Sequence, residues 1–393
     1  MKPLIEPLKP VCMNGRDRLT ATFRGQPVDR VPISPFIYYN SIYEMFRYQP
    51  AIDTYLSPAD FDLVEKFVAY HDHFGFDVLF SLGLLWDSYV PPTAADWDVV
   101  VSHEGDQDRQ RRTTEIRTPG GTLRQVMRFE RSSTYLIVLA VEKYLIETQQ
   151  DFEIFSRYCP PARFIDCELM RRARAGVGDR GLVNVATHGA FNTINQFRNL
   201  EDMMVDPMSD EGFYRAMMEF FLDWNVAHLR QVISAGADSI EIGANLATSV
   251  VGPRFFQQYV RDYENRLAAQ IHQAGAFVVY HNCGDAQKIV HLYNDLEIDV
   301  WGYLTGPPFG DVDLDECLRI LRPNLALRGN IDQVEFLRTA TPQAIKQKVR
   351  DLLEKVKPRG NWILSTTDFP FDGQPYENLH AFAEAGREAG VYG

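Results

Sequence analysis

The sequence predicts an α/β protein built as a (β/α)8 TIM barrel. Short apolar runs rich in β-branched residues recur along the chain, and amphipathic stretches of helical period lie between most of them. Strands that alternate with helices pair in parallel through crossover connections, and eight of them can close into a barrel. The expected strands are Val31–Phe36, Asp77–Leu82, Leu182–Thr187, Ser239–Gly243, Phe277–Cys283, Val300–Leu304, Leu325–Gly329 and Trp362–Ser365.

An open, doubly wound sheet is the competing architecture. Such a sheet would carry a glycine-rich phosphate-binding turn after its first strand. Here the first expected strand, Val31–Phe36, is followed by Tyr38 and Tyr39. This difference favours the barrel.

Four stretches between or after these strands are expected to be helices. Glu211–Ala235 and Pro253–Ala274 carry apolar residues at a spacing near 3.6, and each is followed by a glycine that can cap a helix. Thr341–Val356 begins with threonine and proline, an N-cap followed by proline at the first helical position. Tyr376–Ala389 is expected to form the last helix.

The 393 residues would suit two or three domains of about 150 residues each, but one enlarged barrel also accounts for them. We expect a single domain over residues 1–393, with an N-terminal helical extension before the barrel. Residues Asp96–Arg131 differ from their surroundings because they are rich in charge and contain the turn sequence Thr118–Thr122. This segment is predicted to be a β-hairpin insertion.

Charge and composition exclude several classes of function. The net charge of −13 argues against a nucleic-acid-binding surface and against binding to anionic membranes. No apolar run approaches the roughly 18 residues of a membrane-spanning helix, and the N-terminus does not have the pattern of a signal peptide. The five cysteines are odd in number and form no CxxC pair. We therefore expect no disulfide scaffold, and we expect a cytoplasmic location.

The strongest chemical signal lies at the end of the strand Phe277–Cys283. Ligands of a barrel bind at the C-terminal ends of its strands. Residues i and i+2 of a strand point to the same side, so His281 and Cys283 project together. An imidazole and a thiolate at this separation are natural zinc ligands, while the alternative is a buried cysteine beside a hydrogen-bonded histidine.

Three further residues at strand ends are candidates for chemistry. Glu241 is an acidic residue inside an apolar strand, where a carboxylate is costly unless it is paired or binds a metal. His188 follows the strand Leu182–Thr187 and either faces the pocket or hydrogen-bonds its loop. Asp368 follows the last strand and is either a metal ligand or a turn carboxylate.

Several sequence motifs occur together in a family-specific order. They are Arg16–Leu19, Phe23–Pro32, Thr118–Arg124, Ala235–Ile240, Gly329–Asp332 and Pro375–Asn378. In their order and spacing the chain resembles, over nearly its whole length, the uroporphyrinogen decarboxylase superfamily. Within it, the chain is most similar to the zinc- and corrinoid-dependent methyltransferases.

Two departures from the family pattern refine this resemblance. The decarboxylase itself holds its tetrapyrrole carboxylates with an arginine-rich segment after the first strand. Here no arginine occurs between Ser34 and Arg47, which disfavours the decarboxylase. The methyltransferases bind zinc through His-x-Cys-Gly and a later cysteine. His281 and Cys283 match the first part, and the place of the later cysteine falls on Asp368. Either the metal site is lost, or zinc binds a His/Cys/carboxylate set, which we favour.

The exchange of thiolate for carboxylate leads to a hypothesis about the substrate. An oxygen ligand leaves zinc a stronger Lewis acid, which suits a methyl ether whose oxygen must be polarised. Tyr38 and Trp86, among other aromatic residues, point toward a methoxylated aromatic substrate, and Asn330 is a further candidate contact. Glu241 or His188 would complete the site.

The resemblance implies zinc as the metal and cobalamin carried by a partner, a separate corrinoid protein. The chain has no Asp-x-His-x-x-Gly motif with which to bind cobalamin itself. The small-molecule methyl donor or acceptor, the direction of transfer and homodimerisation stay open.

Two other functions are alternatives to the methyltransferase. One is a metal-free decarboxylase or other lyase acting on a non-porphyrin substrate, with Glu241, His188 or Asp368 as acid or base. The other is a binding protein with a decayed site.

Overall fold

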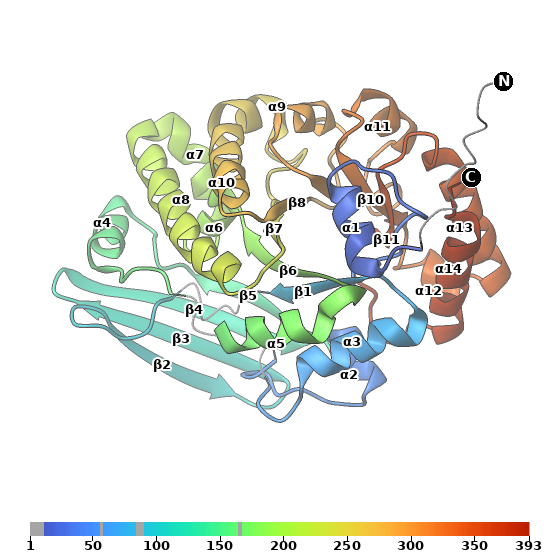
Figure 1. The fold of residues 1–393 in the computed structure, drawn as a ribbon. Coiled ribbons are helices and arrows are strands. Elements are labelled where there is room, and N and C mark those ends of the chain that lie inside the picture. Colours follow the sequence, from blue (N-terminus) through green and yellow to red (C-terminus); the bar gives the residue numbers. More distant parts are fainter. Residues whose placement is uncertain (1–11, 56–57, 84–89, 164–166, 393) are drawn as a thin grey trace, which may run out of the picture.

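In the computed structural model, which describes residues 12–55, 58–83, 90–163 and 167–392, a parallel seven-stranded sheet curls around a central axis (Figure 1). The strands lie side by side in the order in which they occur along the chain, as expected for a barrel. They are β1 (Val78–Gly83), β6 (Gly181–His188), β7 (Ser239–Gly243), β8 (Phe277–His281), β9 (Val300–Leu304), β10 (Ala326–Ile331) and β11 (Trp362–Thr366).

The extended segment around Ile33 closes the gap between the two edges of this sheet. The amide of Ser34 donates to the carbonyl of Leu364 in β11 (2.9 Å), and the amide of Asp77, just before β1, donates to the carbonyl of Ile33 (2.8 Å). The segment is therefore the eighth member of the barrel, and the predicted fold class is confirmed. The expected strand Val31–Phe36 is nevertheless not a regular one, because two of its residues are prolines that lack the amide donor a ladder needs.

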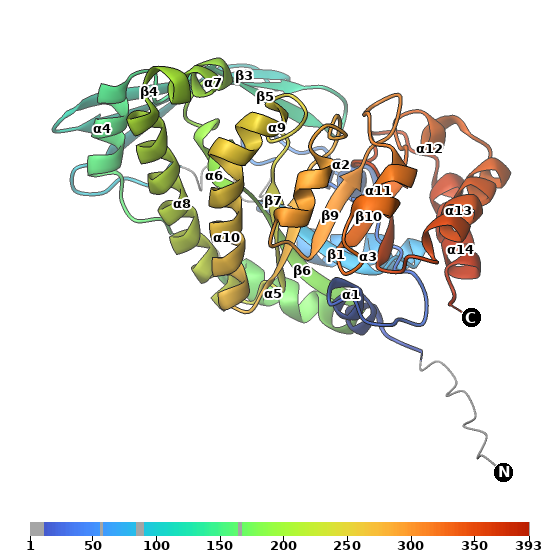
Figure 2. The same ribbon diagram turned by 90° about the horizontal axis from the view of Figure 1, so that it is seen from above.

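Helices surround the strands, as Figure 2 shows for α5, α8, α10, α11, α13 and α14. Their bounds are α1 (Gly15–Phe23), α2 (Tyr39–Met45), α3 (Leu63–Phe74), α4 (Gln149–Tyr158), α5 (Cys167–Val177), α6 (Ala190–Ile194), α7 (Leu200–Ser209), α8 (Glu211–Ser234), α9 (Gly252–Phe255), α10 (Arg261–Gln273), α11 (Leu314–Ile320), α12 (Phe336–Thr339), α13 (Pro342–Val356) and α14 (Tyr376–Ala389). No helix of the described ranges is long and apolar enough to cross a membrane.

Most of the predicted boundaries agree with the structure to within one or two residues. The hydroxyl of Thr341 accepts from the amide of Ala344 (3.3 Å), which confirms the predicted N-cap of α13. The expected helix Pro253–Ala274 is divided, because a π-helical turn at 256–260 separates α9 from α10. The strand predicted to reach Cys283 ends at His281, so that the cysteine lies in the loop that follows.

The insertion between β1 and β6 is larger than the hairpin predicted for Asp96–Arg131. It is a four-stranded antiparallel sheet of β2 (Asp98–Gly105), β3 (Arg109–Thr118), β4 (Gly121–Arg131) and β5 (Ile137–Lys143). The predicted hairpin is its central pair, β3 and β4. Figure 1 shows the sheet at the lower left, to one side of the barrel.

Helix α1 covers the end of the barrel at which the strands begin. Its Leu19 and Phe23 pack with residues at or near the strand starts, among them Leu79, Leu182 and Val300. Arg18 of the same helix forms ion pairs with Asp29 and Asp77. Because this end is filled, the opposite end, where the strands finish, is the place for a functional site.

Candidate active site

Four of the predicted site residues come together where β7, β8 and β11 end. Glu241 lies in β7 and His281 ends β8; Cys283 and Asp368 lie two residues beyond β8 and β11. The Nδ1 atom of His281 is 2.6 Å from Oε1 of Glu241, and Sγ of Cys283 is 3.4 Å from Oδ2 of Asp368. The structure therefore brings the loop after β11 against the ends of β7 and β8. Asp368 in this loop lies 85 residues after Cys283 in the sequence.

Glu241 is buried, and both of its carboxylate oxygens have partners. Oε1 meets His281, while Oε2 accepts a hydrogen bond from Nδ2 of Asn184 (2.7 Å) and lies 3.8 Å from Nη1 of Arg328. Burial acts to raise the pKa of Glu241, but the hydrogen bond from His281 and the charges of His281 and Arg328 outweigh it and lower that pKa. The carboxylate therefore stays ionised inside the barrel.

His281 lies between two acidic partners. Burial acts to lower its pKa, but hydrogen bonds to Cys283 and Glu241 and their charges raise the pKa to about 10. A proton on the imidazole thus holds positive charge beside the carboxylate of Glu241, with Cys283 and Asp368 close by. Such a donor cluster favours a cation, and a metal ion would displace protons as it bound.

The position of Asp368 is set by its neighbours. Its amide donates to Oε1 of Gln333 (3.0 Å), which also accepts from the hydroxyl of Thr367 (2.7 Å). Its own Oδ1 accepts from the amide of Phe369 (2.7 Å), which leaves Oδ2 for Cys283. Burial raises the pKa of Asp368, and the charge of His281 counteracts this effect.

The donor set fits a zinc ion in one measurable respect. With zinc–sulfur and zinc–oxygen bonds of about 2.3 and 2.0 Å, two ligands of a tetrahedral site lie about 3.5 Å apart. The separation of 3.4 Å between Cys283 and Asp368 matches this value. Within the described ranges no three His, Cys, Asp or Glu side chains already converge as a metal-binding group. The three side chains would therefore have to draw closer together around a bound ion.

His188 lies at the same level of the barrel. The strand register pairs it with Gly243, and Gly243 in turn with His281. The imidazole lies over Gly243, where a Cβ atom would come within 2.9 Å of Nδ1, so only glycine permits this approach. Burial and the charge of His281 lower the pKa of His188 to about 4, which keeps this imidazole neutral at pH 7.

Aromatic side chains form a wall beside this cluster. Phe36 stacks on Tyr303 with ring centres 4.9 Å apart and presents its edge to His281 at 5.5 Å. Tyr38 continues the wall, 5.0 Å from Phe369. The sequence predicted Tyr38 as a substrate contact but did not single out Tyr303 or Phe369, although both lie at or just beyond strand ends, the criterion that identified the other residues.

Two predicted substrate contacts are not part of the wall as described. Trp86 lies outside the described residues. Asn330 is half-buried near the end of β10, and its Nδ2 faces Gly306 in the loop after β9, where a Cβ atom would lie 3.9 Å away.

Arg328 was also missed by sequence reasoning. It is an arginine inside the apolar strand Leu325–Gly329, the same signal that singled out Glu241. Its guanidinium lies over the ring of Tyr303, 4.3 Å from the ring centre, and donates to the carbonyls of Ser34 and Pro35. It therefore supplies a buried positive charge next to Glu241.

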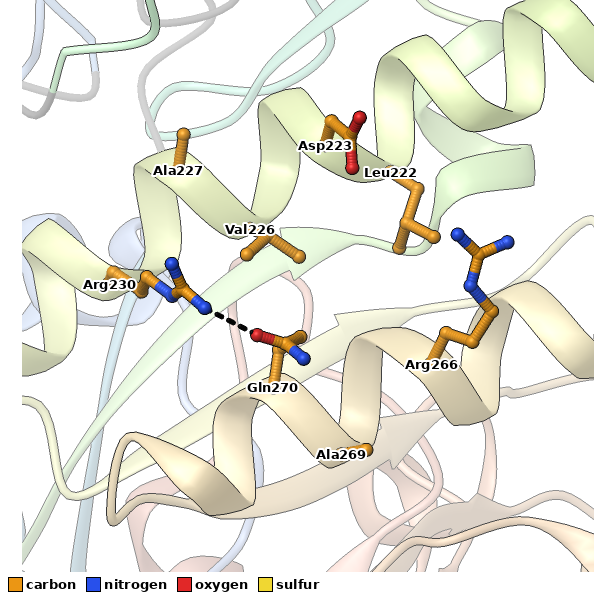
Figure 3. Close-up of a pocket in the computed structure, with 8 residues that line it drawn as sticks. All are labelled: Leu222, Asp223, Val226, Ala227, Arg230, Arg266, Ala269 and Gln270. Atoms are coloured by element: carbon orange, nitrogen blue, oxygen red, sulfur yellow. Dashed lines mark hydrogen bonds between the residues drawn. The ribbon is translucent and has the colours of Figure 1, made fainter.

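A separate cavity of about 500 Å³ lies on the outer helix layer, between α8 and α10 (Figure 3). Arg230 donates across it to Gln270 (2.6 Å), and Arg266 on its rim is paired with Glu219. The two arginines that line this cavity thus already have partners. It lies on the helices, whereas the cluster described above lies at the strand ends.

Comparison with known proteins identifies the family of the chain. The model of the uroporphyrinogen decarboxylase (URO-D) family matches residues 140–389, well over half of the chain. The chain belongs to the URO-D family. The matched region contains all four residues of the cluster, so the family resemblance predicted from the sequence is confirmed.

Among curated proteins, this URO-D family member is similar to methylcobamide:CoM methyltransferase MtbA of Methanosarcina mazei, with 23% identity over 186 residues, 45% of this chain and 50% of the relative. It is also similar to uroporphyrinogen decarboxylase of Gloeobacter violaceus, with 23% identity over 181 residues, 45% and 48% of the two chains. The chain spans about half the length of the curated relatives that it matches.

A solved methyltransferase structure from Methanosarcina mazei shares the fold. The TM-score is 0.69 at 16% sequence identity, and the match covers 96% of this chain and 99% of the other. At this identity the likeness concerns the fold, which agrees with the barrel described above.

Proposed function

We propose that this protein is a zinc-dependent methyltransferase that moves a methyl group between a small substrate and the cobalt of a separate corrinoid protein. The observation that carries the proposal is the cluster at the strand ends, where Cys283 and Asp368 lie 3.4 Å apart beside His281. The similarity to proteins named methylcobamide:CoM methyltransferase supports it. The protein partner and a cytoplasmic location belong to the same proposal, and the single domain over residues 1–393 stays a prediction.

Three residues would hold the metal. Cys283 would bind through its thiolate and Asp368 through Oδ2. His281 would bind through Nε2, because Glu241 engages its Nδ1. Zinc bound by this set would supply Lewis acidity toward a substrate oxygen. Since both oxygens of Glu241 are already engaged, we assign Glu241 to orienting His281 rather than to binding the ion directly.

The aromatic wall supports a flat, weakly charged substrate, and a methoxylated aromatic ring fits it. Phe36, Tyr38 and Phe369 would stack on such a ring and exclude water from the ether group. In the transfer, the bond between methyl carbon and ether oxygen breaks and the oxygen keeps its electron pair as a phenolate. The methyl group passes to the cobalt(I) of the partner, which supplies the electrons of the new bond.

The neutral imidazole of His188 is the candidate acid or base nearest to the cluster. Because its pKa is lowered to about 4, this imidazole is neutral near pH 7 and can accept a hydrogen bond there. A metal-free lyase would use this group together with Glu241 and Asp368. Because one of the relatives is named uroporphyrinogen decarboxylase, the lyase is the second candidate function.

Metal analysis combined with a transfer assay tests the proposal. We expect about one zinc per purified chain and methyl transfer from aromatic methyl ethers to cob(I)alamin, followed by absorbance. Cys283→Ser and Asp368→Ala should lose zinc and activity together. Cys167→Ser, a change at another half-buried cysteine, is the matched control and should keep both. The proposal would be contradicted if the wild-type protein held no stoichiometric zinc and the Asp368→Ala variant kept its methyl-transfer activity.

A further inference from the structure

We infer that Ser239, Asn184 and Glu241 form a hydrogen-bonded relay that sets the metal affinity of the site by fixing the orientation of His281. Asn184 and Ser239 are then positioning residues, since they contact neither the ion nor the substrate. The inference rests on the proposed function, because it concerns the zinc ligand His281. It adds two residues, Asn184 of β6 and Ser239 of β7, that were not among the candidate site residues predicted from the sequence.

The relay crosses three neighbouring strands. The hydroxyl of Ser239 donates to Oδ1 of Asn184 (2.8 Å), and Nδ2 of Asn184 donates to Oε2 of Glu241 (2.7 Å). The other oxygen of Glu241 meets Nδ1 of His281 at 2.6 Å. The strand register places Asn184 of β6 opposite Ser239 of β7, and Glu241 follows two residues later on the same face. Ser239, Asn184 and Glu241 are each at most 1% exposed.

The chemistry of these groups allows one direction for the hydrogen bonds. An ionised carboxylate only accepts, so Asn184 must turn its amide nitrogen toward Glu241. Its oxygen then faces Ser239, whose hydroxyl can donate. For the same reason His281 must place a hydrogen on Nδ1, which leaves Nε2 as the ligand atom. Glu241 thereby determines which nitrogen of His281 is offered to a metal, and Asn184 and Ser239 fix the rotation of Glu241.

Simple neutralisation of a buried carboxylate does not explain this network. Arg328 would suffice for that purpose, yet its Nη1 lies 3.8 Å from Oε2 of Glu241. Its hydrogen bonds go to the backbone carbonyls of Ser34 and Pro35 instead. The short contacts of Glu241 go instead to Asn184 and His281, the partners that fix its rotation. Groups that orient a metal-bound histidine in this way typically change metal affinity by roughly 10–100-fold when removed.

Zinc affinity, measured by competition with a chromophoric chelator, provides the test. We expect Asn184→Ala to weaken zinc binding by roughly 10–100-fold, and Ser239→Ala by less because Asn184 still donates to Glu241. Asn184→Asp preserves shape, and it should weaken binding at least as much because it sets a carboxylate against Glu241. Cobalt(II) spectra of the loaded variants should still show thiolate ligation, since Cys283 is untouched.

Asn378→Ala is the matched control. Asn378 is a buried asparagine of α14 that donates to the carbonyls of Leu337 and Ala340, and its loss should lower stability without changing zinc affinity. If Asn184→Ala and Ser239→Ala only melt earlier, as the control does, while binding zinc as tightly as the wild type, the inference is overturned and the proposed function stands. If the wild-type protein binds no zinc, both fall.

Discussion

Glu264 of α10 offers a quantitative test that is independent of the proposed activity. Its side chain is buried, and neither carboxyl oxygen has a hydrogen-bond partner among the described residues. The carboxyl group packs against Gly189, where a Cβ atom would come within 2.1 Å of Oε1. Burial raises the pKa of this group to about 8, so it is mostly protonated in the folded protein at pH 7.

The expected change in stability follows from the difference between the folded and unfolded pKa values. In the unfolded chain the carboxyl group ionises with its ordinary pKa of 4.5. Since the folded state binds the proton more tightly, the contribution to stability is complete below pH 4.5 and is lost as the pH rises from 4.5 to 8. At 1.36 kcal/mol per pKa unit, the loss reaches about 3 kcal/mol at pH 7.

Glu264→Gln removes the ionisation and keeps the shape. We expect the variant to be more stable than the wild type at pH 7, by about 3 kcal/mol, with the difference shrinking toward pH 5. Urea unfolding at a series of pH values measures this difference. Glu354→Gln, at an exposed position of α13, is the control and should follow the wild-type profile. Parallel profiles for Glu264→Gln and the wild type between pH 5 and 8 would refute the reasoning.

Three further predictions concern other parts of the molecule. Arg328→Met leaves Glu241 without its neighbouring cation and should cost about 3 kcal/mol in urea unfolding, whereas an unchanged midpoint would mean that His281 alone neutralises Glu241. Thr341→Ala removes the N-cap of α13 and should cost about 1 kcal/mol in the same assay, with no change in zinc content. Phe36→Ala should weaken binding of an aromatic ether about tenfold in calorimetry while zinc stays bound; equal affinity would exclude Phe36 from the substrate wall.

Local sequence patterns were enough to predict the elements of the barrel. Alternation and helical periodicity record which face of an element is apolar, so β7, β9 and α14 agree with the predicted ranges. Where the local pattern is mixed, prediction was less complete. The exposed strand β2 carries little periodic signal, and the insertion was therefore predicted as one hairpin instead of four strands.

The candidate site shows the same division. His281 and Cys283 were predictable because their spacing of two places both at one strand end, and Asp368 was expected from a family position. What the sequence by itself determined is therefore the barrel, the family and the identity of the proposed ligands. Only the tertiary structure decided which groups meet: Asp368 against Cys283, Asn184 behind Glu241, and Tyr303 over Arg328. These contacts depend on strand register and barrel closure, which bring together residues far apart in the chain.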